Sequence, residues 1–159
     1  VWTWSAKLYI ENKTLASLDN GKEVIAMFST PTSFNSLLWR LVLLRQDDYL
    51  EGYYSLLHPG QRIEFTSYSI NKHLYSQAED IWSAKRLDWF AQGFIKSMVV
   101  DDYLVISDLR MGFEGNYVFN HAIAKIGNPH FHEIESKLMP SDFGVEDLGY
   151  VWKKLVGES

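Results

Sequence analysis

The stretch that decides the fold of this chain is residues 37–45, which read Leu-Leu-Trp-Arg-Leu-Val-Leu-Leu-Arg. With the two-residue period of a β-strand, alternate side chains fall on opposite faces. The apolar positions are Leu37, Trp39, Leu41 and Leu43 on one face and Leu38, Val42 and Leu44 on the other. A strand that is apolar on both faces is covered on both sides. The sequence therefore predicts a central strand with packing layers above and below it.

Turn-forming residues on either side of this strand divide the rest of the chain into further elements. Besides residues 37–45, the expected strands are residues 23–30, 49–57, 63–69, 94–100, 103–109 and, as the last strand, 117–126. The acidic pairs at residues 47–48 and 101–102 are expected at hairpin tips, since short polar side chains favour turns. Short turns between successive strands predict antiparallel pairing.

Three segments have the features of helices. The first covers residues 1–20, and the last covers residues 141–156, where apolar residues form one stripe. Between them lies a helical insert at residues 71–92, with Asn71 as its N-cap and Gly93 at its end. Asp80 is expected to break this insert and to cap a second helix.

The order of these elements predicts an α+β fold, a mostly antiparallel β-sheet with an N-terminal helix, a helical insert and a C-terminal helix packed on it. Strict alternation of strand and helix is absent from the pattern, which argues against a parallel sheet that binds a dinucleotide. A length of 159 residues is that of one domain.

Charge and composition exclude several classes of function. The net charge is −5, so the chain lacks the positive surface potential that attracts the phosphate backbone of nucleic acids. We therefore expect no nucleic-acid partner. The sequence contains no cysteine, which excludes a disulfide scaffold, a Cys-ligated zinc site and a thiol nucleophile.

The chain begins with Val1, which suggests a single soluble domain, residues 1–159, excised from a longer protein. The helix at residues 1–20 could continue a transmembrane helix, and residues 128–159 form a C-terminal tail and helix. The longest uncharged stretch, residues 24–39, is too short and too polar for a bilayer, which needs about 20 apolar residues. Trp2 and Trp4 suit either a core or a membrane interface.

Two charged residues lie on strand faces that are otherwise apolar. Arg40 shares its face with Leu38 and Val42, and Asp108 shares its face with Ile106. Such charges are costly unless they are paired, so we expect Arg40 to pair with Asp108, or Asp108 to pair with Arg110. These residues form either structural ion pairs or a polar pocket in which Arg40 or Arg110 binds an anion.

The histidines offer weaker candidates. His130, His132 and Glu133 have a spacing that could hold a divalent metal, because His130 and His132 share one face of a strand. The alternative is that these three residues lie in a solvated loop and bind no metal. His121 lies on the strand face of Phe119 and Ile123, where it is either a core histidine or a general base.

Four segments resemble one bacterial family in their order and spacing. They read TPTSFNSLLWR at residues 30–40, YYSLL at 53–57, WFAQGF at 89–94 and DLRMG at 108–112. The chain looks like the soluble C-terminal part of the inner-membrane-associated, LexA-regulated metal-dependent hydrolases. The segment LGYVWKKL at residues 148–155 is similar to the closing helix of that family, and the resemblance covers roughly Trp2 to Val156.

The resemblance implies an extramembrane domain of a hydrolase of the bacterial inner membrane, with a phospholipase-like activity. It implies that the metal ligands lie in a preceding membrane region, so the full-length protein would bind a divalent metal and this chain would hold no cofactor. The domain's partners would be its own transmembrane region and lipid, on a side of the membrane that the sequence does not fix. Arg40, Asp108 and Arg110 would be its candidate site residues.

Two alternatives to this accessory role stay open. The chain could be a non-catalytic module that binds a partner protein or a lipid surface through exposed aromatic side chains. It could instead be a hydrolase in its own right, with a metal at His130, His132 and Glu133. The aromatic content of 15% and the six tryptophans are compatible with the first alternative.

Overall fold

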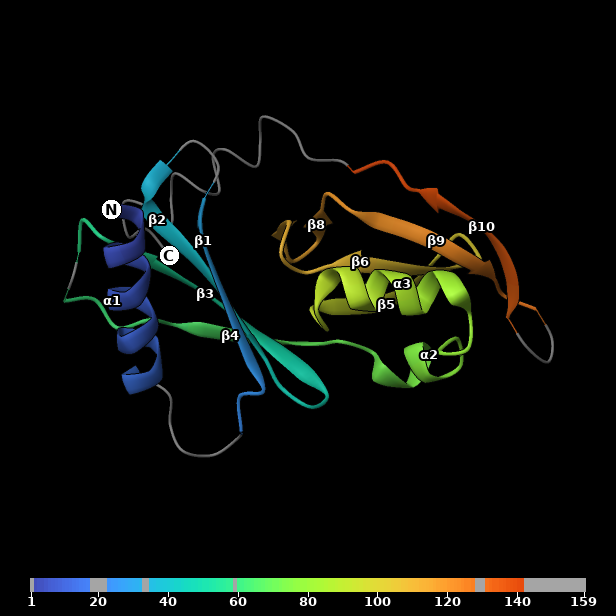
Figure 1. The fold of residues 1–159 in the computed structure, drawn as a ribbon, viewed down its shortest axis with the longest axis horizontal. Coiled ribbons are helices and arrows are strands. Elements are labelled where there is room, and N and C mark those ends of the chain that lie inside the picture. The colour runs from blue at the N-terminus through green and yellow to red at the C-terminus, as the bar shows by residue number, and fades with distance from the viewer. Residues whose placement is uncertain (1, 18–22, 33–34, 59, 128–130, 142–159) are drawn as a thin grey trace. The chain divides into compact units, whose positions relative to one another are not determined.

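A computed structural model describes residues 2–17, 23–32, 35–58, 60–127 and 131–141 of the chain (Figure 1). The chain divides into two compact units. The first contains Val1–Tyr68 with Gly144–Ser159, and the second contains Ser69–Phe143. The expectation of a single domain over residues 1–159 is not tested by this division and stays a prediction.

The first unit is a helix on an antiparallel sheet. Helix α1 (Trp2–Ser17) precedes the strands β1 (Ala26–Thr32), β2 (Asn35–Leu44), β3 (Asp48–Ser55) and β4 (Phe65–Ser69), which lie side by side in chain order. Figure 1 shows α1 alongside this sheet. Ile10 of α1 is fully buried in a cluster with Trp39, Leu41 and Tyr54. The helix expected within residues 1–20 and the strand expected at residues 37–45 are confirmed.

Burial on both faces of β2 is also confirmed. Leu41 and Leu43 are fully buried on the face that carries Trp39, and Leu38 and Val42 are fully buried on the opposite face. Hydrogen-bonded neighbours β1 and β3 flank the strand on its two edges, both antiparallel to it. The central position of residues 37–45 follows from their lack of a polar face.

The second unit places two helices on another antiparallel sheet. Its helices are α2 (Lys72–Ser76) and α3 (Trp82–Ala91). Its strands are β5 (Ile95–Val100), β6 (Tyr103–Asp108), β7 (Gly112–Phe113), β8 (Asn116–Tyr117), β9 (Asn120–Lys125) and β10 (His132–Leu138). The main sheet has the order β10-β9-β6-β5, and β7 and β8 form a separate two-stranded ribbon. Small residues of α3, among them Ala84 and Ala91, pack in the core against Ile95, Leu104 and Ile106.

The α+β class is confirmed, since the structure is mostly antiparallel β-sheet with a few helices. The strands form two four-stranded sheets, and the helical insert separates them in the sequence. Among the described residues, no helix is long and apolar enough to cross a membrane. The helix expected at residues 141–156 falls almost entirely outside the described residues.

Two details of the insert differ from the expectation. Asn71 does occupy the N-cap position of α2, but its side-chain amide donates to the carbonyl oxygen of Ser97 at 2.8 Å. The break near Asp80 is confirmed, yet Ile81 occupies the N-cap position of α3, so the prediction that Asp80 caps this helix is wrong. The helix does end before Gly93, which has a positive φ of 82°.

The expectation that residues 117–126 form the last strand is wrong. Strand β10 follows it and pairs with β9 at the edge of the sheet. Six of the seven residues of β10 are exposed, so the strand lacks the apolar run or the alternation that identifies a strand from sequence. Polar and charged residues are typical of edge strands, where they discourage pairing with other chains.

Candidate functional site

Arg40, a sequence-predicted site residue, lies in a buried ion pair of the first unit. Its Nη2 atom is 2.6 Å from Oε2 of Glu51 on the neighbouring strand, and its Nε atom is 3.2 Å from the same oxygen. Tyr53 donates its hydroxyl to Oε1 of Glu51 at 2.9 Å. Arg40 is 3% exposed and Glu51 is 5% exposed. This partner was not identified from the sequence, and the pair satisfies both charges within the sheet.

Asp108 and Arg110 form the ion pair that the sequence offered as the second possibility. Arg110 donates from Nε and Nη2 to the two carboxylate oxygens of Asp108, at 3.0 Å and 2.7 Å. Its Nη2 atom also donates to the carbonyl oxygen of Phe90 at 2.9 Å, and its guanidinium lies 5.3 Å from the centre of the Phe90 ring. The hydrogen bonds that Arg110 donates to Asp108 raise the pKa of Arg110. This arrangement holds the end of β6 to the end of α3.

Asp108 and His121 line one small cavity under α3, with a volume of about 190 Å³. Leu87 and Phe90 of α3 cover it, and the remaining lining residues are Ile95, Ile106 and Phe119. Burial lowers the pKa of His121, because an apolar environment disfavours the charged imidazolium. The sheet thus brings two of the sequence-predicted polar residues to the same cavity, whose walls are mainly apolar.

The metal candidates are not brought together within the described residues. Because His132 and Glu133 are adjacent in β10, their side chains point to opposite faces of the strand. Both residues are exposed. His130 lies outside the described residues. In the part of the chain that the structure describes, no group of three His, Asp or Glu side chains could hold a metal ion. The metal triad expected from the sequence stays a prediction.

The outward face of α3 is an unusual surface that sequence reasoning missed. Trp82, Trp89 and Phe90 are 64%, 80% and 59% exposed. The inward face of the same helix carries Ser83, Ala84 and Ala91, which are buried. A helix of a folded domain normally buries its large apolar residues and exposes its polar ones. Here the small residues Ala84 and Ala91 allow a close approach to the sheet, and Leu87 packs inward beside them. Trp82 and Trp89 point outward, and the exposed Phe90 lies at the edge of this face, where it also covers the small cavity.

Cationic side chains accompany these aromatic rings. The guanidinium of Arg86 lies 5.1 Å from the centre of the Trp82 ring, and Arg110 stands over Phe90. Lys85 is also on this side of the helix, 3.5 Å from Asp80. We name the set Trp82, Lys85, Arg86, Trp89 and Phe90 the α3 aromatic face. Cations over aromatic rings combine an apolar contact area with a charged rim.

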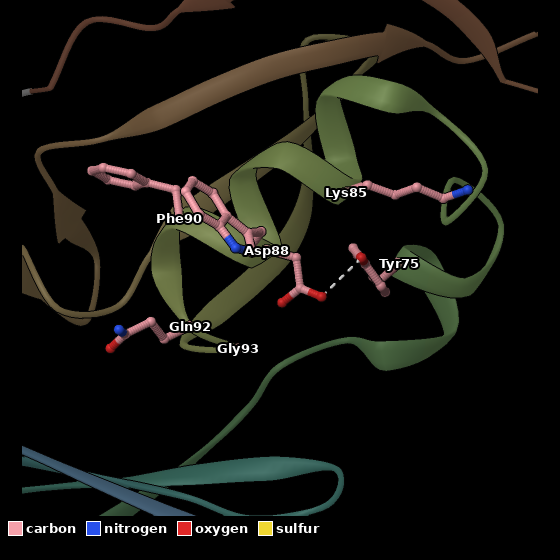
Figure 2. Close-up of a pocket in the computed structure, with 7 residues that line it drawn as sticks. Tyr75, Lys85, Asp88, Phe90, Gln92 and Gly93 are labelled. Atoms are coloured by element: carbon pink, nitrogen blue, oxygen red, sulfur yellow. Dashed lines mark hydrogen bonds between the residues drawn. The ribbon is translucent and has the colours of Figure 1, made fainter.

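A surface pocket of about 700 Å³ adjoins this face, between α2 and the C-terminal half of α3. Figure 2 shows Asp88 pointing toward Tyr75, whose hydroxyl is 3.1 Å from Oδ2 of Asp88, while Lys85 and Phe90 extend away in opposite directions. Burial, together with the charge of Asp88, raises the pKa of Tyr75 to about 12. Tyr75 therefore stays protonated at neutral pH and acts as a donor that fixes Asp88 in place.

Comparison with known proteins gives no further identification. No model of a protein family, no curated protein and no solved structure matches this chain. The membership of the hydrolase family that the sequence suggests therefore stays a prediction.

Proposed function

We propose that this chain is the extramembrane domain of a membrane-bound metal-dependent hydrolase, and that it contacts the lipid surface through the α3 aromatic face. One observation carries the second part of this proposal. Trp82, Trp89 and Phe90 are exposed together on a helix whose buried residues are Ser83, Ala84 and Ala91. Large aromatic side chains that lie exposed next to one another are typical of an interaction surface.

The residue types on this face fit the headgroup region of a bilayer. Tryptophan is enriched at that depth because its ring is apolar while its N–H can still reach water. Lys85 and Arg86 can extend along the apolar surface and keep their charges among the headgroups. Burial of an aromatic side chain is worth about 1.5–3 kcal/mol, so two or three such rings suffice for reversible attachment beside a membrane anchor.

The charge of the chain favours insertion of rings over attraction to anionic lipid. The net charge is −5, and a negative surface potential repels a negative protein. We therefore expect attachment to zwitterionic lipid, with little dependence on salt.

An accessory role is favoured over catalysis within this chain. Arg40, Asp108 and Arg110 are engaged in internal ion pairs, and an anionic substrate would have to displace Glu51 or Asp108 to bind them. Their roles in the proposal are to hold strands and helix in place. The divalent metal of the hydrolase would belong to the membrane region of the full-length protein, and the domain would position that region's lipid substrate.

Co-sedimentation with phosphatidylcholine vesicles tests the proposal. We expect the 159-residue chain to sediment with vesicles and the variant Trp82→Ser/Trp89→Ser to stay in solution. A matched control is Ile25→Ser/Leu57→Ser, which removes two apolar side chains of the first unit that are 63% and 53% exposed. This control should sediment as the wild type does. Equal sedimentation of both variants would contradict the assignment of the α3 aromatic face.

A protein partner is the second candidate for the same face, because tryptophan and arginine also dominate protein interfaces. Failure of the wild-type chain to bind any vesicle, together with capture of its own transmembrane region in detergent, would favour that candidate. The Trp82→Ser/Trp89→Ser variant would then weaken capture instead of sedimentation.

A further inference from the structure

A second cavity lies in the sheet of the second unit, and its volume is about 410 Å³. Its floor is formed by Lys96, Met98 and Val100 of β5 and by Val105 of β6. These residues alternate with Ile95 and Ile106, which face the core under the helices. The cavity therefore opens on the sheet face opposite to α2 and α3, and it is independent of the α3 aromatic face.

A close pair of opposite charges marks one end of this cavity. The ammonium of Lys96 contacts Oε1 of Glu114, and the hydroxyl of Tyr117 donates to Oε2 of Glu114 at 3.0 Å. The side chain of Lys96 is only 13% exposed and that of Glu114 is 24% exposed. Partial removal from water strengthens the interaction of both charges with any group that enters the cavity.

The polar end is held in place by its neighbours. Ser107 donates to Oδ1 of Asn120 at 2.6 Å, and Nδ2 of Asn120 donates to the carbonyl oxygen of Tyr117 at 2.7 Å. Glu114 lies in the turn of the β7–β8 ribbon. Gly112 of the same ribbon has a φ of +115°, and a Cβ there would collide with the carbonyl oxygen of Asn116. A site whose groups are fixed before binding loses less entropy when a ligand arrives.

The remaining walls are apolar except at Asn71. Met98, Val100 and Val105 line the floor, and Met139 and Pro140 close one side. A volume of about 410 Å³ falls inside the range of about 300–1,000 Å³ that is typical of small-molecule sites, which combine apolar walls with a few polar groups.

We propose that this cavity binds a small zwitterion, in which a primary ammonium and an oxyanion lie a few bonds apart and are joined to an apolar group. The oxyanion accepts from Lys96, whose ammonium carries three donors. The ammonium of the ligand donates to the carboxylate of Glu114, which offers several acceptor positions. The apolar group of the ligand lies on Met98 and Val105.

Charge balance selects this class of ligand over singly charged ones. The pair Lys96 and Glu114 is neutral as a whole, so an added anion would compete with Glu114 and an added cation would compete with Lys96. A zwitterion compensates both charges at once and leaves the site neutral. Two sources carry this chemistry, an apolar α-amino acid and the ethanolamine phosphate headgroup of a lipid.

Isothermal titration calorimetry on the 159-residue chain distinguishes these sources. One arm uses L-leucine, and the other uses 1,2-dihexanoyl-sn-glycero-3-phosphoethanolamine, whose short acyl chains supply the apolar group. The matched controls are 4-methylpentanoate, which lacks the amine of leucine, and 3-methylbutylamine, which lacks its carboxylate. Loss of a hydrogen bond between charged groups costs about tenfold or more in affinity, so both controls should bind at least tenfold more weakly than leucine if the amino acid is the ligand. Binding of only the phosphoethanolamine probe supports the lipid headgroup as the source.

Substitutions locate the binding to this cavity. Lys96→Met and Glu114→Gln should each weaken the zwitterion that binds by about tenfold, whereas Lys125→Met, at an exposed lysine of the same sheet, should leave its affinity unchanged. If a single variant fails to fold, Lys96→Met/Glu114→Gln removes both charges together and should still abolish binding. Absence of binding in both arms, equal binding of the singly charged controls, or wild-type affinity in the double variant would overturn the proposal.

Discussion

Arg110 donates hydrogen bonds to the carboxylate of Asp108, two residues before it, from two side-chain nitrogens and from its own backbone N–H. The backbone nitrogen lies 2.9 Å from Oδ1, and Nη2 lies 2.7 Å from Oδ2. Because the same guanidinium also binds the carbonyl oxygen of Phe90, the pair connects the sheet of the second unit to the last turn of α3. The position of the α3 aromatic face therefore depends on this ion pair.

Replacement of Asp108 by Asn should destabilise the second unit by about 2–4 kcal/mol, since it leaves a partly buried guanidinium without its counter-charge. Urea unfolding followed by circular dichroism measures this loss. The control is Asp101→Asn at the exposed hairpin tip, where φ is 48° and asparagine is tolerated, so the unfolding free energy should stay within about 0.5 kcal/mol of wild type. Equal losses in the two variants would show that the ion pair contributes nothing.

The ion pair of Arg40 with Glu51 should behave as a buried unit. Arg40→Met leaves the carboxylate of Glu51 buried beside Tyr53 and should cost about 3–5 kcal/mol. The double variant Arg40→Met/Glu51→Met replaces both charges by apolar groups of similar length and should recover most of this loss. Double-mutant analysis of urea unfolding checks the coupling, and a double variant as unstable as the sum of the two single variants would refute it.

His121 should make the second unit sensitive to acid. Burial lowers its pKa below the ordinary value of 6.5, so the unfolded chain binds a proton more readily than the folded chain does. Stability is therefore unaffected by this residue above pH 6.5 and falls as the pH drops through that value toward the lower pKa of the folded state. His121→Leu should reduce the loss of stability over this interval, as measured by thermal unfolding across it. An unchanged pH dependence would mean that His121 is solvated.

Gly52 should be irreplaceable in β3 for steric reasons. A Cβ at this position would lie 2.7 Å from Cδ1 of Phe65 and 3.0 Å from the carbonyl oxygen of Glu64. Gly52→Ala should thus destabilise the first unit by about 1–3 kcal/mol. A Cβ at Gly60 would meet nothing within 4 Å, so Gly60→Ala is the control and should change the melting temperature little. A stable Gly52→Ala variant would show that β4 can move away without cost.

The sequence predicts the elements of this fold where their side chains carry a clear period. Residues 37–45 are apolar on both faces, and β2 is the central buried strand that this pattern requires. Strand β10 is polar along its length, so no period identifies it. The division into two sheets was not predictable either, because local patterns do not say which strands share hydrogen bonds.

The candidate site is predictable only in part, for a related reason. Arg40 and Asp108 stand out because each is a charge on an apolar strand face, and both are indeed in ion pairs. Glu51 does not stand out, because its strand contains polar and aromatic residues on both faces. The α3 aromatic face has a sequence signal, namely large residues at positions 82 and 89 opposite small residues at 84 and 91. Its meaning depends on which side of the helix faces the sheet, which only the structure establishes.

The central claim is that Trp82 and Trp89 enter a lipid surface, and quenching by brominated phosphatidylcholine tests it most directly. We expect vesicles of this lipid to quench the tryptophan fluorescence of the wild-type chain. The variant Trp82→Phe/Trp89→Phe keeps the apolar area that binds the vesicle but removes the reporters, so it should sediment normally and show little quenching. Quenching of the same size in this variant would place other tryptophans in the lipid and contradict the account.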